Sequence, residues 1–187
     1  MHHRPQRKST LLNLLAFGLL LLPFGSVATG AETQNEAPIF NLRQVSPAVA
    51  LAGRLNNSAL ATIEAENYAA VIDLRTPPEG VAAEQQMFKG TGIEYINIPV
   101  GGELPEAATI RTFNDTMDRL EGKKILIHCQ SGNRVGMMWG VYLTSKGAPL
   151  DEVLEVVKYS ATKEPMLAAI RQYAAETNSA TSLCATC

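Results

Sequence analysis

The sequence predicts a single α/β domain, in which a largely parallel central sheet is flanked by helices in a three-layer arrangement. Two observations predict this class. Short apolar runs alternate along the chain with segments of helical spacing, as in folds whose parallel strands are joined by crossover helices. The composition, with 187 residues, 46% of them hydrophobic and 18% charged, is that of one ordinary globular domain. We place this domain at residues 39–176 and find no internal repeat.

In the first half of the domain, each expected strand is a short apolar run, and glycine, proline or capping residues separate the elements. The run over 69–74 is almost continuously apolar, which is typical of a buried parallel strand. The elements expected, in order, are a strand over 49–53, a helix from Asn57 or Ser58 to about Asn67, a strand over 69–74, a helix over 81–89 and a strand over 93–100.

The second half repeats the alternation. Apolar residues recur at helical spacing after Pro105, which is acceptable in a first turn, and Gly122 ends that helix. Gly147 and Pro149 separate the next helix from the segment 150–159. The elements expected are a helix over 105–120, a strand over 124–129, a helix over 134–146 and a last helix over about 165–175.

The N-terminus has the three parts of a secretory signal peptide. Arg4, Arg7 and Lys8 precede an apolar stretch over 11–22, and small residues follow. We expect residues 1–28 to be removed, with cleavage as late as Ala31 as a variant. The alternative, an uncleaved anchor, is disfavoured because the stretch is shorter than the roughly 20 apolar residues that span a bilayer. A secreted or periplasmic protein without stable membrane insertion is therefore expected.

Charge and histidine content exclude several classes of function. Removing residues 1–28 leaves 13 basic against 18 acidic residues, a formal charge of −5, so nucleic acid is not an expected partner. His128 is then the sole histidine, which excludes a multi-histidine metal site and a distant base for a cysteine protease. We expect no metal and no cofactor.

The C-terminal segment 177–187 is small and polar, and we predict a flexible tail. It holds Cys184 and Cys187 as a C-x-x-C pair. In an oxidising compartment these thiols are expected to form a local disulfide, and redox exchange with Cys129 is an alternative. A thioredoxin-like role is disfavoured, because it requires a C-x-x-C pair at a helix N-terminus after a strand. No strand or helix pattern surrounds this pair.

The main candidate site is the loop after the strand over 124–129. Cys129 ends an apolar strand and faces the start of the next helix, where amide dipoles and a nearby cation favour the thiolate, the nucleophilic form. The amides of Gln130, Ser131, Gly132 and Asn133 are expected to cradle an anion, and the planar fork of Arg134 to bind its oxygens. His128 points to the opposite face and is expected to support the loop. The plainer alternative is a buried strand end.

This loop resembles a known signature. The pattern His128-Cys129-x-x-Gly132-x-Arg134 is similar to that of the protein tyrosine and dual-specificity phosphatases, except that the arginine comes one residue early. The shorter spacing resembles two other groups, the rhodanese sulfurtransferases and the bacterial beta-lactamase-hydrolase-like, phosphatase-like domains of the phosphatase superfamily. Asp73-Leu74-Arg75 suits both groups.

The sequence before the loop resembles the phosphatase-like domain more closely. The Gly-His-Ile-Pro-Gly-Ala stretch usual in rhodaneses is missing. The order of Leu51-Ala52-Gly53-Arg54, the stretch 92–100, a proline-started helix and the cysteine strand resembles the phosphatase-like domain over residues 45–145. This resemblance implies a phosphatase fold and activity on phosphomonoesters.

The resemblance also implies a mechanism and roles for residues. Cys129 would attack a phosphoryl group held by the loop and Arg134, and water would cleave the resulting phosphocysteine. The aspartate that usually protonates the leaving group is missing, so Glu103 is the nearest candidate, ahead of Glu106 and Asp115. The substrate would be a phosphorylated protein or small molecule. A sulfurtransferase using the same cysteine and a catalytically weak anion-binding module are the alternatives.

Overall fold

The computed structural model describes residues 37–184, with side chains through Ser179. These residues form one α/β domain around a five-stranded sheet with the order β1-β2-β5-β3-β4. Every pairing in the sheet is parallel except that of β1 with β2. The predicted fold class is therefore confirmed. The predicted signal peptide, residues 1–28 or 1–31, lies outside the described residues.

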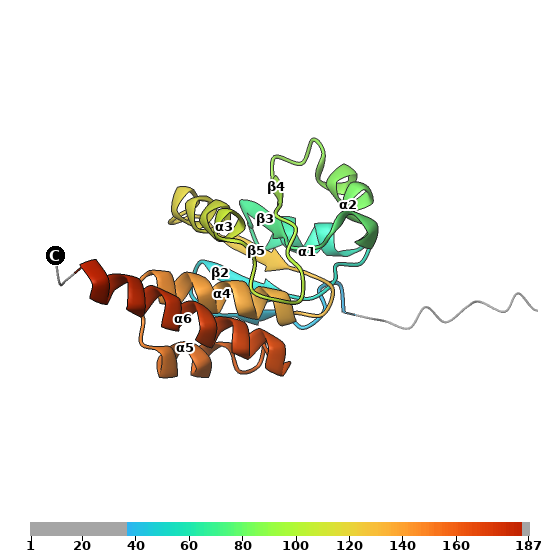
Figure 1. The fold of residues 1–187 in the computed structure, drawn as a ribbon. Coiled ribbons are helices and arrows are strands. Elements are labelled where there is room, and N and C mark those ends of the chain that lie inside the picture. The colour runs from blue at the N-terminus through green and yellow to red at the C-terminus, as the bar shows by residue number, and fades with distance from the viewer. Residues whose placement is uncertain (1–36, 185–187) are drawn as a thin grey trace, which may run out of the picture. The chain divides into compact units, whose positions relative to one another are not determined.

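Figure 1 shows the order of the elements along the chain. The strands are β1 (Arg43–Gln44), β2 (Val49–Ala52), β3 (Ala70–Asp73), β4 (Glu94–Asn97) and β5 (Ile125–His128). The helices are α1 (Ala59–Ala65), the 3-10 turn η1 (Pro77–Glu79), α2 (Val81–Phe88), α3 (Ala107–Arg119), α4 (Asn133–Ser145), α5 (Leu150–Val157) and α6 (Glu164–Cys184). Of the helices between residues 37 and 184, none has the length and apolar character needed to span a bilayer.

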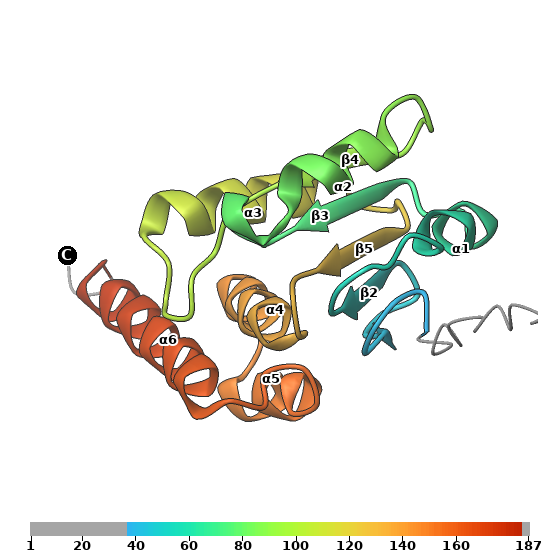
Figure 2. The same cartoon turned by 90° about the vertical axis from the view of Figure 1, so that its right-hand side faces the viewer.

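Helices cover both faces of the sheet, as Figure 2 shows in the turned view. On one face, α1 and α2 enclose a small apolar cluster that includes Ile63, Val71 and Leu126. On the other face, a larger cluster joins the sheet to α3, α4, α5 and α6, with Phe113 and Ile127 fully buried in it. The alternation of side chains along β5 divides it between the two clusters, which is why the whole strand is apolar.

The central strand β5 positions the candidate loop. It pairs with β2 on one side and with β3 on the other, and Ala52, His128 and Asp73 lie in register across the three strands. All four residues of β5 are buried. Since parallel strands end at the same edge of a sheet, Cys129 emerges where the segments after β2 and β3 also begin. Ligand sites of parallel α/β sheets lie at this edge.

Three short features differ from the sequence predictions. Strand β1 and turn η1 were not predicted, because β1 has only two residues, both exposed, and the residues of η1 resemble a simple chain breaker. Strand β4 ends at Asn97 rather than Val100. Beyond it, two backbone bonds still tie the chain to the end of β3, from Ile98 N–H to the Asp73 carbonyl and from Val100 N–H to the Leu74 carbonyl.

Helix α6 is longer than predicted. The helix was expected to end near residue 175, and 177–187 to form a flexible tail, but the helical backbone continues to Cys184. No glycine or proline follows Pro165 to stop it, and Thr177 Oγ1 donates to the Tyr173 carbonyl within the helix. The expected disulfide between Cys184 and Cys187 involves atoms outside those described and stays a prediction.

Candidate active site

The loop between β5 and α4 folds back over the sulfur of Cys129. The residue is fully buried, and its backbone N–H donates to the Ala52 carbonyl at 3.3 Å, which extends the sheet by one bond. The backbone N–H of Gly132 donates to Cys129 Sγ at 3.2 Å. Gly132 caps α4 with φ at 101°, a left-handed conformation that glycine adopts without strain. The turn therefore depends on this glycine and aims an amide at the sulfur.

The remaining N–H groups of the loop form a cradle of donors. Within the described part of the chain, the amides of Gln130, Ser131, Asn133 and Arg134 have no protein acceptor. The last two belong to the first turn of α4, where amide groups point out along the helix axis. Unused amides at a helix N-terminus beside a buried sulfur are suited to binding an anion.

Side chains from distant segments fix the outer surface of the loop. Asn41 Nδ2 donates to the Ser131 carbonyl at 3.1 Å, and the backbone N–H of Arg54 donates to the Gln130 carbonyl at 3.1 Å. The Asn133 side chain accepts hydrogen bonds of 3.0 Å from Thr162 Oγ1 and from the Lys163 backbone. Because these hydrogen bonds engage the Asn133 side chain, the backbone N–H of Asn133 is the group that is left for a ligand.

Arg134 is held at the carboxyl ends of β3 and β4. Its Nη1 donates to the Leu74 carbonyl at 3.3 Å and to the Val100 carbonyl at 3.1 Å. The hydrogen bonds to Glu79 come first among the causes that raise the pKa of Arg134, and the interaction with Cys129 adds to them against the effect of burial. The guanidinium is thus close enough to the sulfur to interact with it, and only 14% of the side chain is exposed.

Glu79 is the partner of Arg134 that sequence reasoning missed. Its Oε1 accepts from Nη2 at 2.6 Å and its Oε2 accepts from Nη1 at 2.8 Å. The hydrogen bonds from Arg134, assisted by those from Thr76, lower the pKa of Glu79 to about 2. The signal was present as a capping box, Thr76-x-x-Glu79, but this pattern also describes a purely local helix start.

A guanidinium has five N–H groups, and the contacts of Arg134 leave one edge without an oxygen acceptor among the described residues. Nη1 serves Leu74, Val100 and Glu79, and one N–H of Nη2 serves Glu79. The Nε–H and the second N–H of Nη2 are parallel donors on the opposite edge. Two such donors match two oxygens of a phosphoryl group.

The candidate acids lie after β4. Glu103 is exposed on the segment 98–106. In the same segment, the Val100 carbonyl accepts a hydrogen bond from Arg134. Glu106 precedes the first turn of α3 and makes no side-chain cap, and Asp115 is exposed within that helix. No hydrogen bond joins any of these three carboxylates to Cys129 or Arg134, so the structure does not bring them together with the loop.

The other face of β5 carries a buried polar cluster. The side chain of His128 is fully buried, and its Nε2 lies 2.7 Å from Glu84 Oε1 and 3.6 Å from Asp73 Oδ1. Among the described residues no loop group hydrogen-bonds the ring, and the loop support expected of His128 stays a prediction. The ring instead faces α2, since alternate side chains of a strand point to opposite faces.

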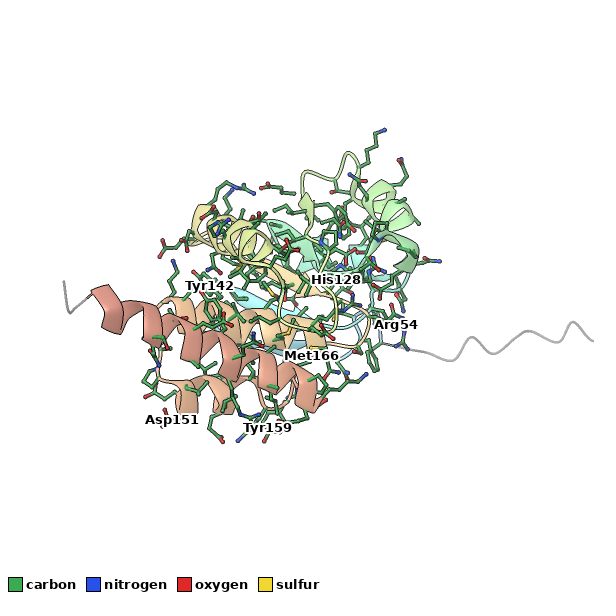
Figure 3. The ribbon with its side chains drawn as sticks, in the orientation of Figure 1. Arg54, His128, Tyr142, Asp151, Tyr159 and Met166 are labelled. Atoms are coloured by element: carbon green, nitrogen blue, oxygen red, sulfur yellow. The ribbon has the colours of Figure 1, made fainter. Side chains whose placement is uncertain are left out.

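Three members of this cluster, Asp73, Glu84 and His128, have the ligand types of a metal site. Arg75 already bridges the two carboxylates, with Nη2 at 2.9 Å from Asp73 and at 2.7 Å from Glu84. The guanidinium thus occupies the cationic position, and the donor set does not fit a metal ion there. Figure 3 shows His128 in the interior of the domain, in contrast to the exposed Tyr159.

Comparison with known proteins agrees with the geometry of the loop. Residues 41–148 match the family described as beta-lactamase hydrolase-like protein, phosphatase-like domain, a span that includes both Cys129 and Arg134. No curated protein matches the chain.

Solved structures of phosphatases share the fold. The chain is similar to Tk-PTP in its active form, with 21% identity over 71% of this chain and 95% of that one, at a TM-score of 0.62. It is similar to a DUF442 protein of Shewanella putrefaciens CN-32, with 22% identity over 74% and 91% of the two chains, at a TM-score of 0.58. A variant of P. aeruginosa TpbA in complex with pTyr shares 15% identity over 76% and 91%, at a TM-score of 0.57. The chain therefore belongs to the family of the beta-lactamase hydrolase-like protein, phosphatase-like domain, and is a phosphoric monoester hydrolase with a protein tyrosine phosphatase-like fold.

Proposed function

We propose that this chain is an exported phosphatase that hydrolyses phosphomonoesters through a phosphocysteine intermediate on Cys129. One observation carries the proposal: the buried sulfur accepts a hydrogen bond from Gly132 at the base of a loop whose other amides have no protein acceptor in the described chain. A thiolate in such a position is a stabilised nucleophile, and the same amides bind the phosphoryl oxygens.

The first step forms a bond between Sγ and phosphorus and breaks the bond between phosphorus and the ester oxygen. The loop amides and the open edge of Arg134 hold the three non-bridging oxygens, whose charge they stabilise in the transition state. The leaving oxygen takes a proton from Glu103 when it is a poor leaving group. This role for Glu103 requires its segment to approach the loop once substrate is bound.

The second step returns the enzyme to its starting state. A water molecule attacks phosphorus, the bond between sulfur and phosphorus breaks, and Cys129 leaves as the thiolate. The proton of the attacking water passes to the Glu103 carboxylate, which is thereby ready for another first step. The products are inorganic phosphate and the free alcohol or phenol.

Glu79 serves as the positioning residue for Arg134. A long arginine side chain has many rotamers, and fixing it before substrate arrives removes an entropic cost from binding. The bidentate pair with Glu79 and the carbonyl of Val100 fix it in the present structure. The ion pair also leaves the open edge of the guanidinium directed away from Glu79.

Export is proposed from the signal peptide that the sequence predicts, and nucleic acid is not an expected partner because of the formal charge of −5. The complex of the similar TpbA variant with pTyr makes a phosphotyrosine peptide a sensible first substrate beside small aryl phosphates. Expression with residues 1–36 intact, followed by fractionation and N-terminal sequencing, tests export. A protein retained in the cytoplasm at full length would overturn this part of the proposal.

The activity is tested with p-nitrophenyl phosphate and purified protein. We expect turnover by the wild type, none by Cys129→Ser, and a phosphorylated Cys129 in wild-type protein quenched with acid and examined by mass spectrometry. A control variant, Ser179→Ala on the exposed surface of α6, should retain full activity. Sulfurtransfer from thiosulfate to cyanide, without phosphate release, would favour the rhodanese alternative. Equal phosphatase rates for the wild type and Cys129→Ser would overturn the proposal.

A further inference from the structure

The proposed chemical steps leave one cleft beside the catalytic loop unused. It lies between the segment after β2 and the start of α2, on the face of the sheet that carries the smaller apolar cluster. Its volume is about 360 Å³, within the range of about 300 to 1,000 Å³ that small-ligand sites occupy. The lining includes Leu55, Asn57, Arg75, Gly80, Ala83 and Met87. The cleft is thus large enough for part of a substrate, and its position and lining indicate which part.

One wall of the cleft continues directly from the catalytic loop. The backbone N–H of Arg54 donates to the Gln130 carbonyl of the loop at 3.1 Å, and Leu55, the next residue, lines the cleft. An extended peptide advances about 3.3 to 3.6 Å per residue. When a phosphorylated residue occupies the loop, its nearest neighbours in a peptide therefore come within reach of this wall.

Glu79 connects the cleft to the loop on another side. Its carboxylate holds Arg134, while its carbonyl accepts a hydrogen bond of 3.2 Å from Arg75 Nη1. Gly80, the next residue, lines the cleft together with Arg75. A single residue thus separates the cleft from the guanidinium that is proposed to bind the phosphoryl oxygens, so both sites can serve one substrate.

Arg75 supplies a buried hydrogen-bond donor to the cleft. Its Nε and Nη2 donate to Asp73 at 3.0 and 2.9 Å, and Nη2 also lies 2.7 Å from Glu84. Of the two N–H groups of Nη1, one donates to the Glu79 carbonyl, and the other has no acceptor among residues 37–184. Such a donor gains a hydrogen bond when a ligand brings an oxygen to it. Because the bidentate pair with Asp73 already balances the charge of the guanidinium, an uncharged acceptor such as a peptide carbonyl suits the remaining N–H.

Gly80 keeps that donor accessible from the cleft. Its backbone has φ at 95°, in the left-handed region that glycine adopts without strain. A Cβ at this position would lie 4.0 Å from Arg75 Nη1. A longer side chain would therefore extend over the nitrogen, and the glycine leaves that space to a ligand oxygen.

The rest of the lining is mostly apolar. Leu55 and Met87 are half-buried against the smaller apolar cluster, and Ala83 is exposed on α2 beside them. A methionine side chain adapts its shape to different apolar partners. An apolar amino-acid side chain fits such a surface better than a sugar, whose hydroxyl groups would lose water without gaining hydrogen bonds.

We propose that this cleft is the subsite for a residue next to the phosphorylated one in a peptide substrate: an apolar side chain packs on Leu55, Ala83 and Met87, and a backbone carbonyl accepts from Arg75. The inference rests on the proposed function, which places the phosphoryl group at the loop. It makes the phosphatase selective for phosphopeptides with an apolar neighbour. A small aryl phosphate fills the loop and leaves the cleft empty.

Two phosphotyrosine peptides test this selectivity with full-length wild-type protein. They differ only in the residues on either side of phosphotyrosine, which are leucine in one and glycine in the other. We expect kcat/KM to be about tenfold higher for the leucine peptide, because part of the leucine side chain leaves water. Equal kcat/KM for the two peptides would overturn the proposal, whatever the variants show.

The Ala83→Leu substitution fills the cleft with a side chain that a helix tolerates. The ratio of kcat/KM between the leucine and glycine peptides should then fall to about one, a tenfold loss of selectivity. Ala82→Leu is the matched control, since Ala82 is exposed at the neighbouring position of α2 and lines a different hollow. It should keep the wild-type ratio. A variant Ala83→Leu that is folded by circular dichroism and still prefers the leucine peptide would overturn the proposal.

The proposed function and the subsite can fail separately. A wild type that does not hydrolyse p-nitrophenyl phosphate would contradict the function, and fluorescence anisotropy with the two labelled peptides would then decide the subsite. Binding of the leucine peptide that is about tenfold tighter, and that Ala83→Leu weakens, would support it, whereas equal binding would overturn it. Glucose 6-phosphate hydrolysed faster than the leucine peptide, with the same sensitivity to Ala83→Leu, would overturn the assignment to a peptide.

Discussion

Glu79 and Arg134 are separated by 55 residues in the chain, yet the carboxylate of one meets the guanidinium of the other through two hydrogen bonds of 2.6 and 2.8 Å. The pair joins the turn after β3 to the first turn of α4. Because Arg134 also donates to the carbonyls of Leu74 and Val100, the arginine fixes the ends of two strands as well as the loop. Local stability and, under the proposed function, substrate binding therefore depend on the same ion pair.

The Glu79→Gln variant should lose much of its activity. An amide cannot accept from both guanidinium nitrogens, so Arg134 loses its fixed orientation and binds the transferring phosphoryl group less well. We expect kcat/KM for p-nitrophenyl phosphate to fall roughly ten- to hundredfold, as for other small displacements of a positioning group. The Glu64→Gln variant is the control, since that carboxylate is exposed on α1. Unchanged kcat/KM in Glu79→Gln would show that Arg134 needs no such support.

The same pair predicts a dependence of stability on pH. The pKa of Glu79 is about 2 in the folded protein, below its ordinary value of 4.5. A lowered pKa means that the pair contributes its full stabilisation above pH 4.5 and loses it progressively as the pH falls toward 2. In urea unfolding, the stability difference between the wild type and Glu79→Gln should be largest at pH 7 and shrink at pH 3. A difference that is independent of pH would contradict this assignment.

The role proposed for Glu103 predicts an effect that depends on the leaving group. Protonation matters for an alkyl phosphate, whose alkoxide is a poor leaving group, and matters little for p-nitrophenyl phosphate. The Glu103→Gln substitution should therefore lower kcat for an alkyl phosphate about a hundredfold and change kcat for the aryl ester only slightly. Glu106→Gln is the matched control from the same segment. Equal losses on the two substrates would exclude Glu103 as the acid.

Periodicity and the loop motif predicted the elements that depend on local sequence. The run over 69–74 and the run before Cys129 were predicted as strands because buried parallel strands are continuously apolar, and both lie in the sheet. Placing Cys129 at the carboxyl edge followed from the strand order that such folds adopt. Gly132 of the predicted loop adopts the left-handed backbone at the turn that leads into α4.

Pairings between distant segments could not be predicted in this way. Glu79 looks like a helix cap and Glu84 like an ordinary helical surface residue, because their partners Arg134 and His128 follow at least 44 residues later in the chain. Contacts of this kind are set by tertiary packing rather than by the local pattern.

Two glycines of α4 allow a final prediction about that packing. A methyl group on Gly136 would lie 2.4 Å from the backbone nitrogen of Ala161, whereas one on Gly140 would lie 2.6 Å from the end of the Ile170 side chain. Alanine favours a helix over glycine by up to about 1 kcal/mol, and an Ile170 rotamer change can relieve the second clash. A backbone clash has no such relief and typically costs about 1 to 3 kcal/mol.

We therefore expect Gly136→Ala to lower the free energy of unfolding clearly, and Gly140→Ala to change it by less than about 1 kcal/mol, as measured by urea unfolding. Gly136→Ala should also reduce phosphatase activity, because the segment that it displaces leads to Thr162 and Lys163, which hold the Asn133 side chain of the loop. Gly140 lies two helical turns beyond the loop along α4, so Gly140→Ala serves as the control for activity. If both variants lost the same activity, the segment after α5 would not be what fixes the loop.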